Sequence, residues 1–314
     1  MSEHAHYAII ENGQRSFYDS RWGAPHIQNE LLGGSEDLLE LLRTDNVHEP
    51  IDMFEPEVAE AGLLLDMDRK YLLWCGNDMP VLEVFSLRQL YLKLIQPHWQ
   101  DWTIQWADEG PLEIARALGL DLETLCTGDQ LRLPTCEVAS LIKAVPPGTA
   151  ADTLSLMSLR DRNGTVKHYL FAEMSSGLLL QGPGLIDKLR TCVESPFPKE
   201  TYTPWMVSDA PTEERKPVNG VFLDVANQEL WWWSSGFPFR GDLVRLAELW
   251  PRWTVRVHTS GLVRHAMLAC VDQDIRMPKR EAAQIVQQWL ESEGSEEWKQ
   301  FLRKNYFAQH SAFH

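Results

Sequence analysis

The sequence predicts an α+β protein made of two tandem, diverged copies of one module, each a mainly antiparallel sheet with helices on one side, plus C-terminal helices. Three signals predict this fold because they recur in the same order in both halves: an Asn-Gly turn, a hairpin that ends in tryptophan, and a Trp-x-x-Trp-Thr element followed by a glycine. A length of 314 residues also favours two domains of ordinary size.

The three signals align at nearly constant offsets. Asn12-Gly13 and Asn163-Gly164 lie 151 positions apart, and both favour a type I′ hairpin turn. Residues 62–74 match residues 220–232 at an offset of 158, where an apolar strand ends at Asp66 or Asp224 and a second strand ends in tryptophan. Residues 99–103 match 250–254 at an offset of 151, and each is followed by a glycine seven residues after its threonine. The shared module order is hairpin, helix, hairpin, helix, strand, helix.

Apolar periodicity places these elements in the chain. In the first copy it predicts helices near residues 36–43, 84–94 and 112–118, with the last strand at 102–107. In the second copy it predicts helices near 185–192, 242–249 and 262–270, with the last strand at 253–258.

Breaks between these patterns predict three regions: an acidic N-terminal α+β module at 1–145, a second copy at 150–275, and a C-terminal helical appendix at 276–314. Val145-Pro-Pro-Gly-Thr149 is a boundary signal, and residues 194–219, with five prolines, predict a long loop. The appendix predicts helices at 278–290 and 295–301, and an appended helix often covers an exposed face or edge.

Most of the net charge of −16 belongs to the first half. Residues 1–150 hold 10 basic and 25 acidic residues, whereas residues 151–314 hold 19 and 20. This negative field disfavours nucleic acid as a partner, and no apolar run is long enough to predict a membrane span. A soluble, cytoplasmic protein is expected. An acidic surface for a basic protein partner is one interpretation, and a solvated surface that keeps the chain soluble is the other. The residues assigned to the partner surface are Glu36, Asp37, Glu40, Glu55, Glu57, Asp108 and Glu109.

The chain is also rich in tryptophan, with thirteen residues. On a strand, Trp231 and Trp233 point to one face and Trp232 to the other, and the match of Trp232 with Trp74 predicts that Trp232 lies in the core. If exposed, Trp231 and Trp233 could form an aromatic platform with Trp205. The alternative is that they pack under the proline-rich loop or the C-terminal helices.

No motif for metal, nucleotide or nucleophile chemistry is present. The five cysteines never have CxxC spacing and are expected to be reduced and buried. His4 and His6 are expected in a frayed N-terminus, and no HExxH, Cys/His quartet or pair of histidines with a carboxylate is legible. Neither serine-glycine segment is a Gly-x-Ser-x-Gly elbow. No metal and no cofactor are expected, and Asp66 and Asp224 are interpreted as turn residues.

Three functional hypotheses follow. The first is a non-catalytic protein-binding or inhibitory protein with the physical character of bacterial immunity proteins, which are acidic, cytoplasmic and neutralise a basic toxin. The second is an enzyme whose site is not visible as a motif. The third is a small-ligand or carbohydrate binder that uses the tryptophan face. The sequence favours the first.

Overall fold

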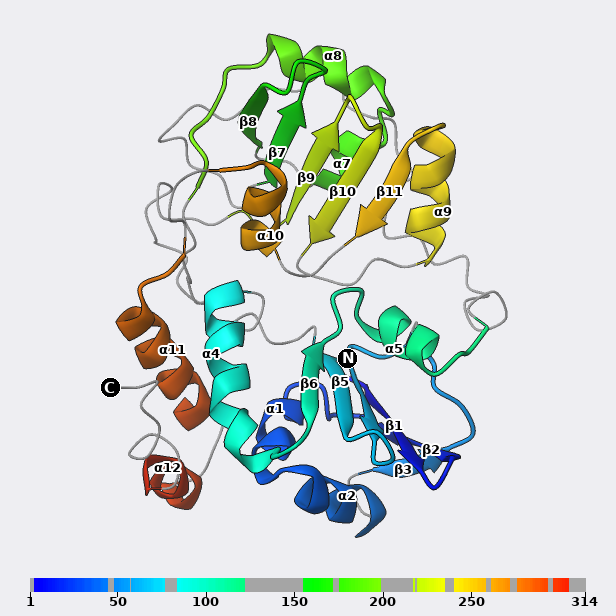
Figure 1. The fold of residues 1–314 in the computed structure, drawn as a ribbon, viewed down its shortest axis with the longest axis vertical. Coiled ribbons are helices and arrows are strands. Elements are labelled where there is room, and N and C mark those ends of the chain that lie inside the picture. The colour runs from blue at the N-terminus through cyan, green and yellow to red at the C-terminus, as the bar shows by residue number, and fades with distance from the viewer. Residues whose placement is uncertain are drawn as a thin grey trace. The chain divides into compact units, whose positions relative to one another are not determined.

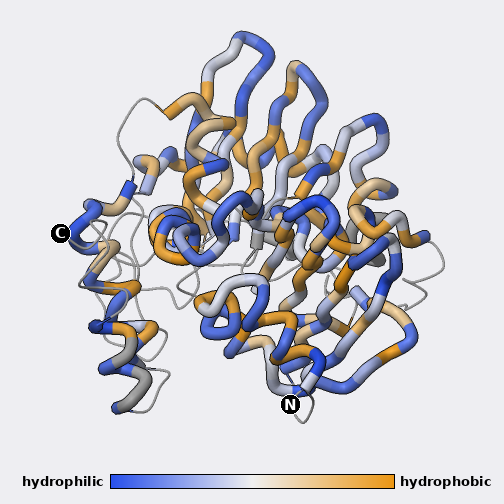
Figure 2. Tube along the Cα trace, turned by 60° about the horizontal axis from the view of Figure 1, so that its bottom comes forward, coloured by the Kyte–Doolittle hydropathy of each residue, from blue (hydrophilic) through white to orange (hydrophobic). Residues whose placement is uncertain are grey.

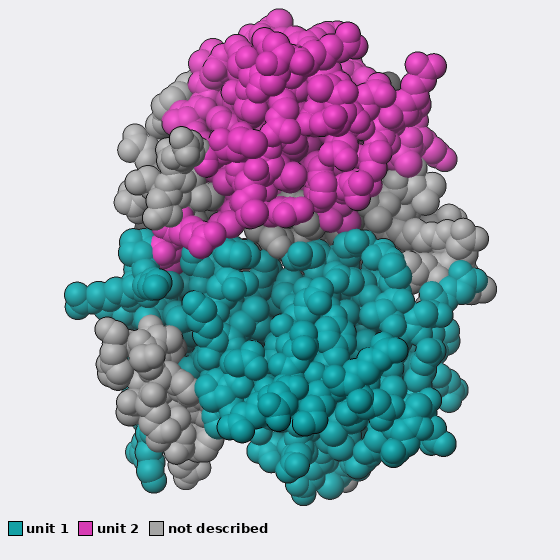
Figure 3. Space-filling model, viewed as in Figure 1, with its two compact units in different colours: residues 1–127, 278–314 teal, residues 128–277 magenta. Residues whose placement is uncertain are grey.

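The computed structural model describes residues 3–44, 48–56, 58–76, 84–121, 155–171, 175–198, 217, 219–234, 240–257, 261–271, 276–292 and 296–304. The chain forms two compact units (Figure 3). Unit 1 comprises Met1–Thr127 together with Pro278–His314, and unit 2 comprises Gly128–Met277. The C-terminal helices therefore belong to unit 1, although they follow the second module in the sequence.

Unit 1 contains a mixed sheet of six strands in the order β3-β2-β1-β4-β5-β6 (Figure 1). The hairpins β1–β2 and β4–β5 and the pair β2–β3 are antiparallel, whereas β1–β4 and β5–β6 are parallel. Its strands are β1 (Ala5–Glu11), β2 (Gln14–Ser20), β3 (Glu49–Ile51), β4 (Ala61–Asp66), β5 (Tyr71–Gly76) and β6 (Thr103–Trp106). Its helices are α1 (Ile27–Glu30), α2 (Ser35–Thr44), α4 (Phe85–Ile95), α5 (Pro111–Ala117), α11 (Lys279–Ser292) and α12 (Glu296–Leu302), with short 3₁₀ turns at Leu31–Gly33 and Gln96–His98.

Unit 2 repeats this topology in the order β11-β10-β9-β7-β8, with no counterpart of β3 among its described residues. Here too, two antiparallel hairpins are joined by a parallel pair, and the last strand adds in parallel. The tandem α+β organisation is thereby confirmed. Its elements are β7 (Ser155–Arg160), β8 (Val166–Phe171), α7 (Ser175–Leu179), α8 (Gly184–Thr191), β9 (Asn219–Asp224), β10 (Glu229–Ser234), α9 (Arg240–Leu249), β11 (Thr254–Val257) and α10 (Gly261–Leu268).

The predicted helices and last strands of both copies are present close to their predicted ends. Three elements were not predicted: β3, α1 and α7, which have three, four and five residues. Elements this short contain too few positions for a periodic pattern. The predicted boundary at 145–149 lies outside the described residues.

The two Asn-Gly turns differ. Asn12 and Gly13 both have positive φ, 53° and 73°, as a type I′ turn requires. In the second copy only Gly164 of the pair is left-handed, and the Asp161 N–H donates to the Thr165 carbonyl, so the loop is longer. The type I′ prediction is therefore wrong for Asn163-Gly164, because the extra length lets Asn163 keep an ordinary backbone.

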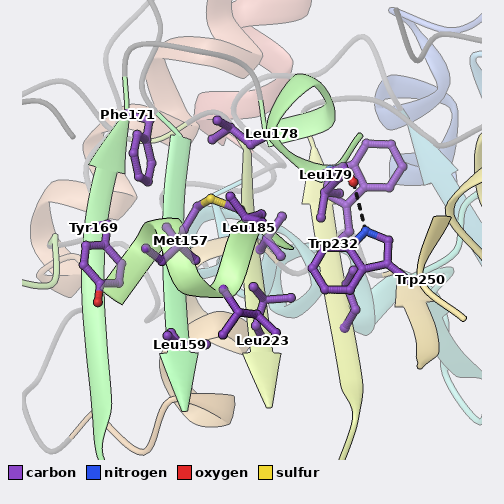
Figure 4. Close-up of a cluster of buried hydrophobic side chains, with 14 of the residues drawn as sticks. Met157, Leu159, Tyr169, Phe171, Leu178, Leu179, Leu185, Leu223, Trp232 and Trp250 are labelled. Atoms are coloured by element: carbon purple, nitrogen blue, oxygen red, sulfur yellow. Dashed lines mark hydrogen bonds between the residues drawn. The ribbon is translucent and has the colours of Figure 1, made fainter. Parts of the chain in front are cut away.

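The core of unit 2 lies on one face of its sheet (Figure 4). Met157, Leu159 and Trp232 pack there against α7, α8 and α9, and we call this the core face. Successive strand residues point to opposite sides, so Trp231 and Trp233 lie on the other face, where Trp233 contacts His265 of α10. We call this the α10 face. The prediction placed helices on one face only, whereas helix α10 lies on the second face.

The Trp-x-x-Trp-Thr element makes the same contacts in both units. The first tryptophan, Trp99 or Trp250, is fully buried, and its indole N–H donates to the carbonyl of Leu31 at 2.7 Å or of Leu179 at 2.9 Å. Its ring packs edge-on against the second tryptophan, Trp102 or Trp253, with ring centroids 5.2 Å and 5.1 Å apart respectively. In both units the first tryptophan is thus anchored to the helical segment that follows the first hairpin.

Two glycines allow this anchor to form. Gly34 and Gly182 both have positive φ, 89° and 59°. A Cβ on Gly34 would lie 2.5 Å from the carbonyl oxygen of His98, and one on Gly182 would lie 2.7 Å from that of Leu249. Each carbonyl belongs to the residue just before the anchoring tryptophan, so no larger residue fits either position.

Helix α11 packs on α4 within unit 1 (Figure 1). Ala282, Val286 and Leu290 are buried on one side of α11, and the Trp289 ring meets the Tyr91 ring of α4 at 5.8 Å. Hydrophobic residues concentrate in the strands, and the hairpin tips are hydrophilic (Figure 2). No helix in the described part of the chain has the length and apolar character that a membrane crossing requires.

Candidate functional site

The predicted acidic residues lie on three different elements of unit 1. Glu36, Asp37 and Glu40 are exposed together on α2, where the first two occupy the helix N-terminus that favours negative charge. Glu55 is exposed in the segment between β3 and β4. Glu57 lies outside the described residues.

Asp108 and Glu109 lie in the turn between β6 and α5, and Glu109 is partly neutralised. Its carboxylate pairs with Arg116 at 2.8 Å, and its backbone N–H donates to the carboxylate of Glu113 at 3.0 Å. Burial raises the pKa of Glu113, and the neighbouring Asp108 and Glu109 act in the same direction. This turn therefore presents less negative charge than its residue count suggests.

Three of the five exposed large apolar side chains of the described residues lie just outside strands of the unit 1 sheet: one follows β2, one follows β3 and one precedes β4. They are Trp22, Met53 and Val58, with exposed fractions of 55%, 43% and 45%. The segment of Trp22 lies beside residue 3, because the Glu3 N–H donates to the Arg21 carbonyl at 3.0 Å.

The carboxylates Glu49, Asp52 and Glu55 lie in β3 and in the segment that follows it, and they are exposed. In the antiparallel register of β2 and β3, Glu49 stands opposite Asp19. The backbone N–H of Glu55 donates to Nδ1 of His6 at 3.1 Å. We call Trp22, Glu49, Asp52, Met53, Glu55 and Val58 the sheet-end surface. The sequence did not reveal its apolar members, because exposure of an apolar side chain depends on what the fold places above it.

Behind this surface lies a cluster of His4, His6 and Asp19. Nδ1 of His4 and Nε2 of His6 lie 2.8 Å and 3.2 Å from the same oxygen of Asp19. His6 is a buried residue of β1, so the expectation of a frayed terminus is wrong for it, since β2 and β4 pair with it on both sides. Burial lowers the pKa of His6 from 6.5 to about 4, and His6 is therefore neutral at pH 7.

This cluster groups two histidines with a carboxylate, an arrangement typical of metal sites and not legible from the sequence. The hydrogen bonds nevertheless argue against metal ligation. A backbone N–H can only donate, so Nδ1 of His6 carries no proton and Nε2 must carry it. A protonated Nε2 has no lone pair for a cation. The geometry supports a role in holding the Glu55 segment and Asp19 in place.

The tryptophan face is mostly covered. Trp233 is 6% exposed and its indole N–H donates to Nδ1 of His265 at 2.9 Å. Trp231 is half-buried, and the guanidinium groups of Arg256 and Arg264 lie 5.2 Å and 5.4 Å from its ring centroid. Trp205 lies outside the described residues. The expected core position of Trp232 is confirmed.

A polar chain continues from Trp233 across the α10 face. Nε2 of His265 lies 2.7 Å from Oγ of Ser158, which lies 2.8 Å from Nδ1 of His168. Because the indole only donates, Nε2 of His265 carries the ring proton and donates to Ser158. His265 therefore cannot accept the serine proton as a catalytic base. Ser158 is also fully buried, and we interpret the chain as a satisfied structural network.

The described cysteines have free thiols but are not uniformly buried. Cys75 is buried and its burial raises its pKa well above the ordinary value, whereas Cys192 is half-buried and Cys270 is exposed. The expectation of burial is wrong for Cys270, because it follows α10 with a left-handed backbone at φ 52°. No family model, curated protein or solved structure matches the chain.

Proposed function

We propose that the protein is a non-catalytic binding protein that takes a basic protein partner on unit 1, in the manner of immunity proteins that neutralise a toxin. The observation that carries the proposal is the sheet-end surface, where exposed Trp22, Met53 and Val58 stand among exposed carboxylates. Aromatic and methionine side chains are enriched at the centres of protein interfaces, and charges at their rims steer association.

The acidic helix α2 adds to this proposal. Glu36, Asp37 and Glu40 extend the negative field of unit 1 and would accelerate the approach of a basic partner. A cytoplasmic location belongs to the same proposal, and the free thiols of Cys75, Cys192 and Cys270 are in keeping with a reducing compartment.

The other hypotheses gain less support. A carbohydrate platform requires exposed aromatic faces, but Trp233 is buried and a sugar on Trp231 would have to displace a guanidinium group. An enzyme requires accessible, converging ionisable groups, whereas Ser158 is fully buried and receives a hydrogen bond from His265, which therefore cannot act as its base. Neither hypothesis is favoured by a specific observation.

The experiment uses the full chain as bait and, as the first probe, the purified product of any adjacent gene that encodes a basic protein. Trp22→Ala should weaken binding about tenfold or more if Trp22 is an anchor. Charge reversal of Glu55 or of the three α2 carboxylates to lysine should slow association and reduce its dependence on salt.

Val193→Ala is the control, because Val193 is also an exposed large apolar side chain, at 71%, but belongs to unit 2. It should leave affinity unchanged. The proposal fails if Trp22→Ala and the charge reversals bind every tested basic partner as the unaltered chain does, at low and at high salt.

A further inference from the structure

Two exposed arginines of unit 2 share one tryptophan on the α10 face. Arg256 of β11 stands opposite Trp231 of β10 in the strand register, and Arg264 projects from α10. Both guanidinium groups lie over the Trp231 ring, at 5.2 Å and 5.4 Å from its centroid. Both cations therefore contact the same aromatic ring.

These cations have little counter-charge. The nearest carboxylate, Glu229, lies 3.8 Å from Nε of Arg256, too far for a hydrogen bond, and its other oxygen accepts from the Trp231 indole at 3.4 Å. Among the described residues no carboxylate lies within ion-pair distance of Arg264. Arg160 in the same unit, by contrast, pairs with Asp224 at 2.9 Å. Two like charges with one weak counterion favour the arrival of an anion.

The first copy has uncharged and acidic residues in place of the two arginines. Gln105 stands opposite Leu73 in the register that pairs Arg256 with Trp231, and Glu113 follows Gly110 by three residues as Arg264 follows Gly261. The amide of Gln105 donates to Glu113 at 3.4 Å, so this pair satisfies itself. The module therefore folds without the arginine cluster, which is specific to the second copy.

We propose that Arg256, Trp231 and Arg264 form a site for a carboxylate group of an acidic protein segment. A guanidinium presents its N–H donors in a planar fork that matches a carboxylate, and the Trp231 ring holds both forks in position. The net charge of −16 repels long polyanions, which disfavours nucleic acid over a short acidic segment. This site differs in sign and in unit from the sheet-end surface and does not depend on the function proposed for it.

The test is calorimetric titration of the full chain with a capped hexaglutamate peptide at low ionic strength. Arg264→Gln should weaken binding about tenfold, the scale of one charge-assisted hydrogen bond. Arg264→Glu, which installs the residue type of the first copy, should abolish it. Arg252→Gln is the matched control, since Arg252 is exposed in the same unit and contacts no ring or carboxylate among the described residues, and it should bind as the unaltered chain does.

Perturbation of the Trp231 indole N–H resonance by the peptide, absent in Arg264→Gln, would place the peptide at the cluster. Equal binding by Arg264→Gln, Arg252→Gln and the unaltered chain would overturn the proposal. A single-stranded oligonucleotide that binds more tightly than the peptide, and loses affinity with Arg264→Gln, would also overturn it and assign the cluster to nucleic acid.

Discussion

Asp66 and Asp224 show how one residue keeps its role in both copies while its surroundings diverge. Each accepts backbone N–H groups of its own turn, from Arg69 at 3.0 Å or from Ala226 and Asn227 at 3.0 Å, which confirms the turn role predicted from the sequence. Asp224 in addition binds Arg160, which stands where the first copy has Ile10. The shared contact is structural, and the added ion pair belongs to the second copy.

The neutral state of His6 leads to a prediction about pH. Its folded pKa of about 4 is below the unfolded value of 6.5, so between these values the unfolded chain binds the extra proton. The contribution of His6 to stability is therefore complete above pH 6.5 and declines as the pH falls towards 4, by about 3 kcal/mol at most. Urea unfolding across this range measures the decline.

His6→Leu gives the matched comparison, because Leu156 occupies the equivalent position in β7. The variant should show a shallower decline of unfolding free energy between pH 6.5 and 4, whatever its absolute stability. An NMR titration in which the His6 ring protonates near 6.5 would contradict the assignment of a buried neutral histidine.

Among elements, helix α11 makes a testable contribution to unit 1. Leu290 is fully buried where α11 packs on α4, so Leu290→Ala should lower the free energy of unfolding by about 2 to 5 kcal/mol. The exposed Gln288 lies on the same helix, and Gln288→Ala should change stability by less than about 0.5 kcal/mol. Equal losses in both variants would mean that the α11 surface does not stabilise the unit.

The sequence predicted long elements well and short ones poorly. Periodicity over ten or more residues located α2 and α4, and the repeat located β6 and β11 through their preceding tryptophans. Strand β3 has three residues including Pro50, and only its pairing with β2 identifies it as a strand. Such an element depends on tertiary contacts that no local pattern contains.

Some residues of the candidate surfaces could be predicted from the sequence, and others could not. The exposed carboxylates of α2 could be predicted because their spacing places them on the polar side of an amphipathic helix. The exposure of Trp22 could not, because an apolar residue is expected inside until the fold shows that more than half of its surface is open. The arginine cluster was accessible in principle, since aligning the copies places Arg264 against Glu113.

At the scale of the whole molecule, the second copy is inserted into a unit completed by the C-terminal segment. Unit 1 draws on residues 1–127 and 278–314, and unit 2 on residues 128–277. The two copies diverge in charge from −15 to −1 over residues 1–150 and 151–314, so the repeated frame carries different surfaces. Divided connectivity of this kind makes folding of unit 1 dependent on a segment remote in sequence.

Splitting the chain tests this dependence. A fragment of residues 128–277 should fold alone, with a cooperative thermal transition and dispersed NMR signals, because its core cluster draws only on its own strands and helices.

A fragment of residues 1–127 should be less stable than unit 1 in the full chain, because the side of α4 that contacts α11 is then open to water. Adding a peptide of residues 278–314 should raise its transition temperature, more so at higher peptide concentration, and the same peptide carrying Leu290→Ala should do so less. A 1–127 fragment that unfolds at the temperature of the full chain's unit 1, with or without the peptide, would show that the C-terminal helices are not part of the cooperative unit.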